Sequence, residues 1–201
     1  MTDQQFEILI VCHANICRSP MAERLARKSV TERMGEHAAG FRVVSAGTHA
    51  WSNAAIHPFA AEVLRERGAD PTGFLSRRLT EALVRRAGLI LTATRRQRSD
   101  CVALDPSAVR RTFTLLQFRR YAAALRPADL AAVWPPQARL QKMIEAVSVI
   151  RGQLPVPPAD EDDLVDPVQS PVEVFRRSAA EIGSVVDVMT GLIAPVQTAS
   201  R

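Results

Sequence analysis

An apolar run that is separated by seven residues from a helix start constrains this fold more than any other feature. Phe6–Val11 has the length and the β-branched residues of a buried strand. Ser19 and Pro20 mark a helix start, because serine caps helices and proline fits the first turn. The chain must therefore turn tightly after Cys12. Such a turn points successive backbone N–H groups at one place, beside the positive end of the helix dipole, where an oxyanion would sit.

Two side chains of this turn suit phosphate chemistry. Cys12 would act there as a thiolate, which the same positive field favours. Arg18 follows with five residues in between, and its forked guanidinium would bind two phosphate oxygens. On its own, this spacing more often means a buried strand-end cysteine and a surface arginine, so the flanking residues decide.

The flanking residues extend the pattern into a long and specific signature. Val11–Glu23 reads Val-Cys-His-Ala-Asn-Ile-Cys-Arg-Ser-Pro-Met-Ala-Glu and resembles the signature loop of the low-molecular-weight protein tyrosine phosphatase family. The resemblance covers 6–116 and 166–193 and looks like that of an extended, actinobacterial type. It implies a phosphatase that forms a cysteinyl-phosphate on Cys12 and uses no metal or other cofactor. The phosphate would be held by Arg18 and by the backbone of His13, Ala14, Asn15, Ile16 and Cys17.

Strands alternate with helices along the chain. The apolar runs predict strands at 6–11, 41–45, 88–92 and 112–116, with a helix after each of the first three. This alternation predicts a parallel sheet covered on both faces, an α/β three-layer sandwich. The resemblance adds the strand order 2-1-3-4. Ligands bind such sheets at the carboxyl ends of the strands, where Cys12 lies.

The length suits one domain over 1–201. Helical segments are expected at 117–134 and 136–152, separated at Pro135-Pro136, so that 118–165 forms a helical insertion relative to the family. A final helix is expected at about 172–193. The insertion would shape the pocket entrance or form a dimer contact, and the oligomeric state is left open.

A phosphatase of this kind needs a proton donor for the leaving oxygen. Three Asp-Pro pairs offer one, at Asp70, Asp105 and Asp166, although Asp-Pro is common in plain turns. Asp166 stands where the family carries its catalytic Asp-Pro-Tyr, so we expect it to act as general acid and then as base. Asp163 is the second choice.

Three polar residues would support the loop. The Ser19 hydroxyl would donate to the Cys12 sulfur, or it would instead cap the helix. Asn15 tolerates the positive φ that a tight turn demands. The resemblance implies that Asn15 braces the loop through Ser45, which alone would read as an ordinary strand-end serine.

The residues that would face the substrate depart from the family. Val168 replaces the tyrosine of Asp-Pro-Tyr, and Ala14 replaces a glycine. Trp51 would form the remaining aromatic wall, or would be a packing anchor. His13 would contact the substrate at the rim, or would face solvent. We therefore expect a phosphorylated substrate that is either a phosphotyrosine protein or a small phosphometabolite such as a sugar or nucleotide intermediate.

The three cysteines bear on the rival functions. Cys17 would form a reversible disulfide with Cys12 by family resemblance, or would be a small packing residue. Arsenate reduction needs two further cysteines outside the loop. The sequence offers one, Cys101, and we expect it to be buried. A non-catalytic phosphate-binding module would not need Cys12, Arg18, Ser19 and Asp166 together.

Composition excludes several other classes. The odd cysteine count and the missing secretion pattern favour a reducing cytoplasm. No run of 18 apolar residues is present, so no membrane partner is expected. The net charge of +5 comes from basic residues that are nearly all arginine and have no interleaved aromatic residues. No nucleic-acid partner is therefore expected, although the charge would attract anionic substrates.

Overall fold

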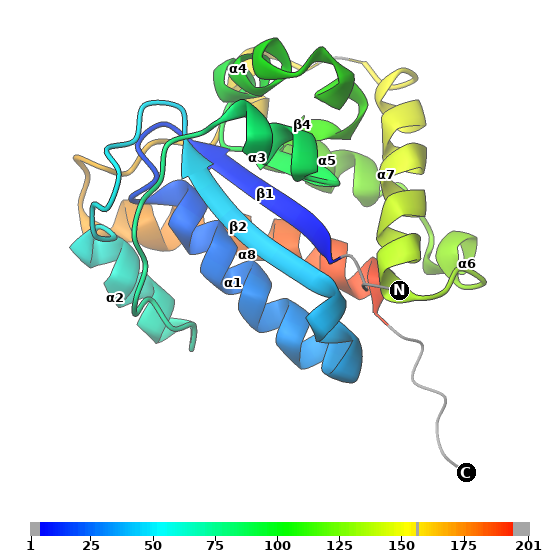
Figure 1. The fold of residues 1–201 in the computed structure, drawn as a ribbon, viewed down its shortest axis with the longest axis horizontal. Helices are drawn as coiled ribbons and strands as arrows, with labels where there is room; N and C mark the ends of the chain where they lie inside the picture. The colour runs from blue at the N-terminus through cyan, green and yellow to red at the C-terminus, as the bar shows by residue number, and fades with distance from the viewer. Residues whose placement is uncertain (1–4, 156, 195–201) are drawn as a thin grey trace.

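A four-stranded parallel sheet forms the centre of the computed structural model, which describes residues 5–155 and 157–194 (Figure 1). Its strands run in the order β2-β1-β3-β4. Their bounds are Phe6–Cys12 for β1, Phe41–Gly47 for β2, Leu89–Thr92 for β3 and Thr112–Thr114 for β4. The predicted α/β class and the 2-1-3-4 order are confirmed.

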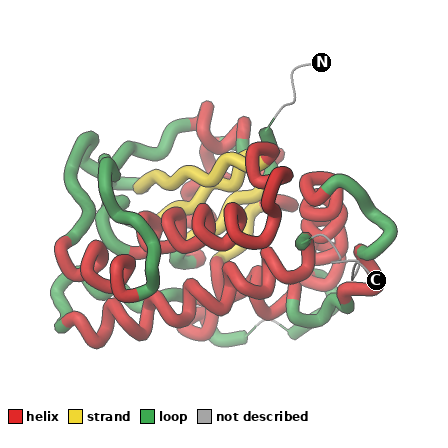
Figure 2. The backbone as a smooth tube through the Cα atoms, turned by 90° about the horizontal axis from the view of Figure 1, so that it is seen from below, coloured by secondary structure: helices red, strands yellow, loops and turns green. Residues whose placement is uncertain are grey.

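Helices cover both faces of the sheet, as Figure 2 shows. Alternate residues of β1 supply two separate cores: Ile8 and Ile10 face one, and Leu9 and Val11 face the other. The larger core contains α1 (Arg18–Met34), α2 (Pro58–Glu66), α5 (Leu115–Ala122), α7 (Pro136–Arg151) and α8 (Val172–Ile193). The smaller contains α3 (Glu81–Arg86), α4 (Arg95–Leu104) and the 3-10 helix Pro106–Arg111. The chain is thus a three-layer sandwich.

The strand ends differ from the prediction in an informative way. β1 continues to Cys12 and β2 to Gly47, because these two residues pair as the last rung of the parallel ladder. β4 stops at Thr114, two residues early. There the Thr114 hydroxyl accepts from the Gln117 backbone N–H, and the Gln117 side chain accepts from the Thr114 N–H. This capping box starts α5 directly at the strand end.

The predicted single helix over 117–134 is wrong. α5 ends at Ala122, and a separate turn, α6, spans Pro127–Leu130. Pro127 has no backbone N–H to donate, and it forces the preceding Arg126 into an extended conformation (φ −94°, ψ 141°). Proline therefore interrupts the helix well before Pro135-Pro136.

The C-terminal part of the chain returns to the carboxyl end of the sheet. After the 3-10 helix Ala159–Asp162, the backbone N–H of Leu164 donates to the carbonyl of Ala93, just beyond β3, at 2.9 Å. α8 then runs along α1, where Ser29 and Thr190 share a buried hydrogen bond of 2.9 Å. Among the described helices, none is both long and apolar enough to cross a membrane.

Candidate active site

The segment from Cys12 to Arg18, called here the Cys12–Arg18 loop, turns its carbonyls outward. Thr48 and His49 donate to the carbonyls of Cys12 and His13 at 3.0 and 2.9 Å, and His57 donates to that of Ile16 at 2.9 Å. Within the described part of the chain, five loop N–H groups have no acceptor, namely those of His13, Ala14, Ile16, Cys17 and Arg18. The loop therefore presents a ring of free donors, as an oxyanion cradle requires.

The sequence can form this turn because of two residues. Asn15 adopts φ 55°, which asparagine tolerates better than other side chains. Gly47 on β2 lies against the loop, and a Cβ there would come within 2.6 Å of the His13 carbonyl oxygen. Ala14 has no positive φ, so its replacement of a glycine causes no backbone strain.

The Cys12 thiol is buried and surrounded by hydrogen-bonding groups. Its Sγ lies 3.0 Å from the Ser19 hydroxyl and accepts from the Asn15 backbone N–H at 3.3 Å. α1 begins at Arg18, one residue earlier than predicted, so Ser19 is inside the helix and does not cap it. The Ser19 hydroxyl is therefore available to hydrogen-bond with the Cys12 sulfur.

A chain of hydrogen bonds sets the direction of the Ser19 proton. Glu23 is buried, and its carboxylate can only accept, so Ser45 donates to it at 2.6 Å. The Ser45 oxygen then accepts from the Asn15 side-chain amide, whose second hydrogen goes to the Ser19 oxygen, both at 2.9 Å. The Ser19 hydroxyl then has two acceptors within reach, the Cys12 sulfur at 3.0 Å and the Ala46 carbonyl at 3.5 Å, and the shorter contact favours donation to Cys12.

Glu23 and one backbone group belong to this site but were not identified from the sequence. The backbone N–H of Arg77 donates to the Asn15 side-chain oxygen at 2.8 Å and completes the amide's partners. Glu23 lies at i+4 from Ser19 on α1, which was a usable signal. The contribution of Arg77 comes from its backbone and leaves no mark on the sequence.

The Arg18 guanidinium is buried and tied to the segment before α8. One terminal nitrogen donates to the Leu164 carbonyl at 3.0 Å, and the other to the Asp166 carboxylate at 2.5 Å. Its Nε is buried without a hydrogen-bond partner among the described residues. Arg18 thus retains one donor without a partner, and its side chain lines the same cavity as Cys12.

Asp166 reaches the loop, whereas the other candidate acids do not. Its side chain is 44% exposed, and among the described residues no other carboxylate lines the cavity that Cys12 and Arg18 share. Asp163, the second choice, accepts from the backbone N–H of Arg95 at 2.7 Å, so it caps α4 instead. Asp70 and Asp105 bind the turn residues that follow them, Thr72 and Ser107, which is the ordinary turn role.

A cavity of about 60 Å³ lies where these groups meet. It is lined by Cys12, His13, Ala14, Ile16, Cys17, Arg18, Asp166 and Val168. A water molecule takes about 30 Å³ of liquid, so the cavity suits an anion of a few heavy atoms. The rest of a larger substrate would lie outside it.

The expected aromatic wall is displaced from this cavity. Trp51 is 85% exposed and is absent from the cavity lining. His13 lines the rim, where its ring stacks on His49 with centroids 4.6 Å apart. Among the described residues, His13 and Val168 line the cavity and His49 stacks behind His13, while the expectation for Trp51 stays a prediction.

The remaining cysteines are poor nucleophiles. Burial, followed by the charges of Cys12 and Asp166, raises the pKa of Cys17 to about 12, although Arg18 opposes the shift. Burial raises the pKa of Cys101 to about 12 as well. Cys101 belongs to the smaller core, on the opposite face of the sheet from Cys12. Among the described residues, no group of three His, Cys, Asp or Glu side chains could hold a metal.

Comparisons with known proteins agree with this geometry. Residues 7–133 match the family model of low molecular weight phosphotyrosine protein phosphatase. The probable low molecular weight protein-tyrosine-phosphatase EpsP of Ralstonia solanacearum is 37% identical over 114 residues, which are 57% of this chain and 73% of that protein. The protein-arginine-phosphatase of Bacillus subtilis is 38% identical over 113 residues, 56% of this chain and 71% of that one.

A solved structure extends the likeness over nearly the whole chain. The YwlE arginine phosphatase from Geobacillus stearothermophilus superposes with a TM-score of 0.64 and 25% identity, covering 92% of this chain and 91% of that one. None of these relatives bears on the actinobacterial type, which stays a prediction. With the matched model spanning more than half of its length, the chain belongs to the low molecular weight phosphotyrosine protein phosphatase family of cysteine-dependent hydrolases.

Proposed function

We propose that this phosphatase works through a cysteinyl-phosphate, with Cys12 as nucleophile, Arg18 as phosphate clamp and Asp166 as general acid and base. One observation carries the proposal: the Cys12 thiol, the Arg18 side chain and the Asp166 carboxylate line one small cavity, at a loop with five backbone N–H groups that have no acceptor among the described residues. Each component required for phosphoryl transfer is therefore present at one point.

The first step forms a bond from Cys12 Sγ to phosphorus and breaks the ester bond. The leaving oxygen takes a proton from the Asp166 carboxyl group, while the loop N–H groups and Arg18 bind the phosphoryl oxygens. In the second step, Asp166 accepts a proton from water, and the resulting hydroxide displaces the sulfur. Inorganic phosphate leaves, and the Cys12 thiolate is restored with the help of the Ser19 hydroxyl.

The substrate is a phosphate monoester whose larger part lies outside the cavity. The relatives include a tyrosine phosphatase and an arginine phosphatase by name. Val168 is exposed at the mouth in place of the family's tyrosine. No contact at this mouth favours a small phosphometabolite over a phosphorylated protein side chain. Turnover of a phosphotyrosine peptide against a panel of sugar and nucleotide phosphates separates the two, and a strong peptide preference excludes the metabolite alternative.

The two rival functions are disfavoured by the geometry. Arsenate reduction needs cysteines that relay electrons from Cys12, but Cys101 is buried on the other face of the sheet. A binding module would not require a carboxylate in contact with the clamp, and Asp166 supplies one. The free thiols fit the reducing cytoplasm that we propose as the compartment.

Hydrolysis of p-nitrophenyl phosphate tests the proposal. The wild type should release p-nitrophenol, and Cys12→Ser should abolish release while still binding phosphate, because the cradle is backbone. Cys101→Ala is the matched control and should retain activity. An inactive wild type that binds phosphate would instead support the non-catalytic module. An active Cys12→Ser variant would refute the assigned nucleophile.

A further inference from the structure

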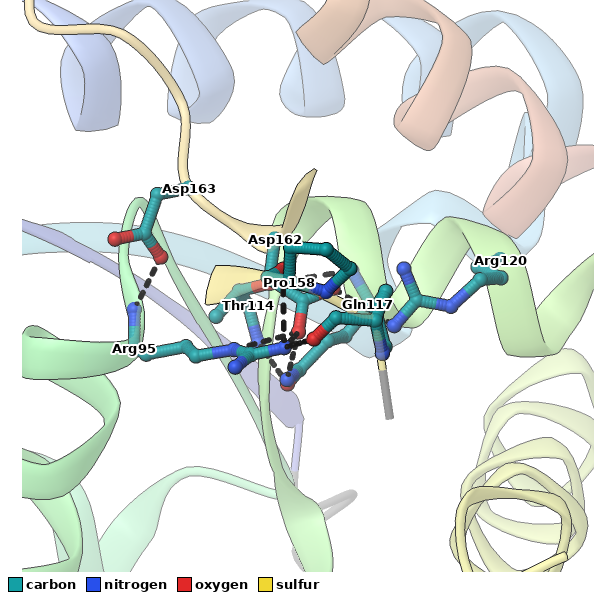
Figure 3. A network of polar contacts seen from close by, with 8 residues as sticks. Arg95, Thr114, Gln117, Arg120, Pro158, Asp162 and Asp163 are labelled. Atoms are coloured by element: carbon teal, nitrogen blue, oxygen red, sulfur yellow. Dashed lines mark hydrogen bonds and ion pairs between the residues drawn. The ribbon is translucent and has the colours of Figure 1, made fainter. Parts of the chain in front are cut away.

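We propose that Asp162 is a positioning residue that holds the general acid, Asp166, over the Cys12–Arg18 loop. The inference rests on the proposed role of Asp166 and names a residue that does not touch the cavity. Its basis is a buried polar network that anchors the segment leading to the acid (Figure 3).

Asp162 is the centre of that network. Its carboxylate is fully buried and accepts hydrogen bonds from three side chains. Arg95 Nε donates at 2.7 Å, Gln117 Nε2 at 2.6 Å and Arg120 at 2.7 Å, and a second Arg95 nitrogen also contacts it. These donors come from α4 and α5, which follow the carboxyl ends of β3 and β4. The contacts therefore connect the segment around Asp162 to the helices that follow β3 and β4, the two strands at the edge of the sheet opposite β2.

The network holds an ionised carboxylate. Burial alone would raise the pKa of Asp162, but hydrogen bonds from Gln117, Arg95 and Arg120 outweigh it and hold that pKa below its usual range. The guanidinium groups of Arg95 and Arg120 both form ion pairs with this carboxylate. A buried carboxylate with several charge-assisted bonds has one favourable geometry, which makes it a rigid anchor.

The two residues after Asp162 are also held in place, on the way to Asp166. The Asp163 carboxylate accepts from the Arg95 backbone, and the Leu164 N–H donates to the Ala93 carbonyl at 2.9 Å. Between Leu164 and Asp166, Val165 is 66% exposed. Four residues span at most about 14 Å, so Asp166 stays close to Asp162, and we expect a shift at Asp162 to displace Asp166. A displacement of about 1 Å at a reacting group can cost roughly 100-fold in rate.

The network gives a role to two of the four acidic residues that precede Asp166. Among Asp160, Glu161, Asp162 and Asp163, only the last two have side-chain partners among the described residues. Glu161 is exposed and offers a matched control that removes one charge beside Asp162. If only the negative charge of this run mattered, substitution of Glu161 and of Asp162 would lower activity equally. If Asp162 is an anchor, only its substitution should lower activity.

The test compares two substrates that differ in their need for an acid. Phenyl phosphate releases a phenol with a pKa of about 10, so it needs protonation. The leaving group of 2,4-dinitrophenyl phosphate is stable as an anion and does not. We expect Asp162→Asn to lower kcat/KM for phenyl phosphate by roughly 30-fold, with less than about 3-fold loss on the dinitrophenyl ester. Inorganic phosphate should still inhibit Asp162→Asn, because Thr48, His49 and His57 hold the loop backbone independently of Asp162.

The outcomes separate this inference from the proposed function. Equal losses on both substrates, or no loss, in a folded Asp162→Asn variant would overturn the inference, as would the same pattern in Glu161→Gln. If Asp166→Asn itself shows no leaving-group dependence, the acid assignment fails instead. Should Asp162→Asn not fold, Arg120→Gln removes one donor and leaves the other two. It should give the same leaving-group dependence at smaller amplitude, and a uniform loss there also overturns the inference.

Discussion

Arg18 donates to the carboxylate of Asp166 at 2.5 Å, although the two residues are 148 positions apart in the chain. The proposed phosphate clamp and the proposed acid are therefore in direct contact. The Leu164 carbonyl accepts from the same guanidinium at 3.0 Å, so the segment before α8 orients Arg18 as well as supplying the acid.

This contact predicts opposite effects of Asp166→Asn on turnover and on binding. Loss of the general acid should lower kcat for phenyl phosphate by about 100-fold or more. Removal of the negative charge beside the anion site should tighten inhibition by inorganic phosphate by a few-fold, because like charges repel. Steady-state kinetics with phosphate as inhibitor measure both. Weaker phosphate inhibition would mean that Asp166 supports the anion site and does not compete with it.

The hydrogen-bond chain behind the loop makes a second prediction. Ser19→Ala removes the hydroxyl 3.0 Å from Cys12 and should lower kcat by roughly 10-fold or more, since a hydrogen bond to a charged group contributes about 1.5–3 kcal/mol. Glu23→Gln should cause a smaller loss, because the amide oxygen can still accept from Ser45, although more weakly than the carboxylate. Glu32→Gln, on the exposed side of α1, is the control. A Ser19→Ala enzyme with wild-type kcat would contradict the role of the Ser19 hydroxyl.

The buried carboxylate of Asp162 makes the third prediction, for stability. Its folded pKa lies below the unfolded value of about 3.9, so its contribution is present above that pH and is lost as pH falls through the folded pKa. Asp162→Asn should cost about 3 kcal/mol in the free energy of unfolding at pH 7, and the difference from wild type should shrink below pH 4. Urea denaturation at pH 7 and pH 3 checks this. A difference that is equal at both pH values would count against an ionised Asp162.

The pair of loop cysteines makes the fourth prediction. Cys17 stays a thiol at neutral pH because its pKa is about 12, so peroxide should oxidise Cys12 first, to a sulfenic acid. Attack by Cys17 would then release water and leave a Cys12–Cys17 disulfide that a reductant reverses. Intact mass should show the loss of two hydrogen atoms. Cys17→Ser should instead lose activity irreversibly, and Cys101→Ala should behave as wild type. Recovery of the Cys17→Ser variant by reductant alone would argue against the disulfide.

Much of the fold followed from local patterns. The alternation of apolar runs with helix signals predicted the parallel sheet, and Ser19-Pro20 predicted the start of α1 to within one residue. The prediction failed where two local signals competed. Thr114 and Gln117 turned an apolar strand end into a helix start, and Pro127 divided the expected 117–134 helix. Both differences from the prediction depend on one or two residues, and hydrophobic periodicity does not take such single residues into account.

The sequence by itself determined the Cys12–Arg18 loop, because the strand, the turn and the helix start are contiguous and their geometry is set by neighbouring residues. The family resemblance pointed to Asp166 as the acid, but its contact with the loop is a tertiary contact that local patterns do not give. Asp163 and Asp166 are the same residue type three positions apart, but one caps α4 and the other contacts Arg18. The roles of Glu23 and Asp162 likewise depend on partners from other elements. A buried carboxylate is defined by the donors that packing brings to it, and that packing joins segments too distant for local sequence to relate.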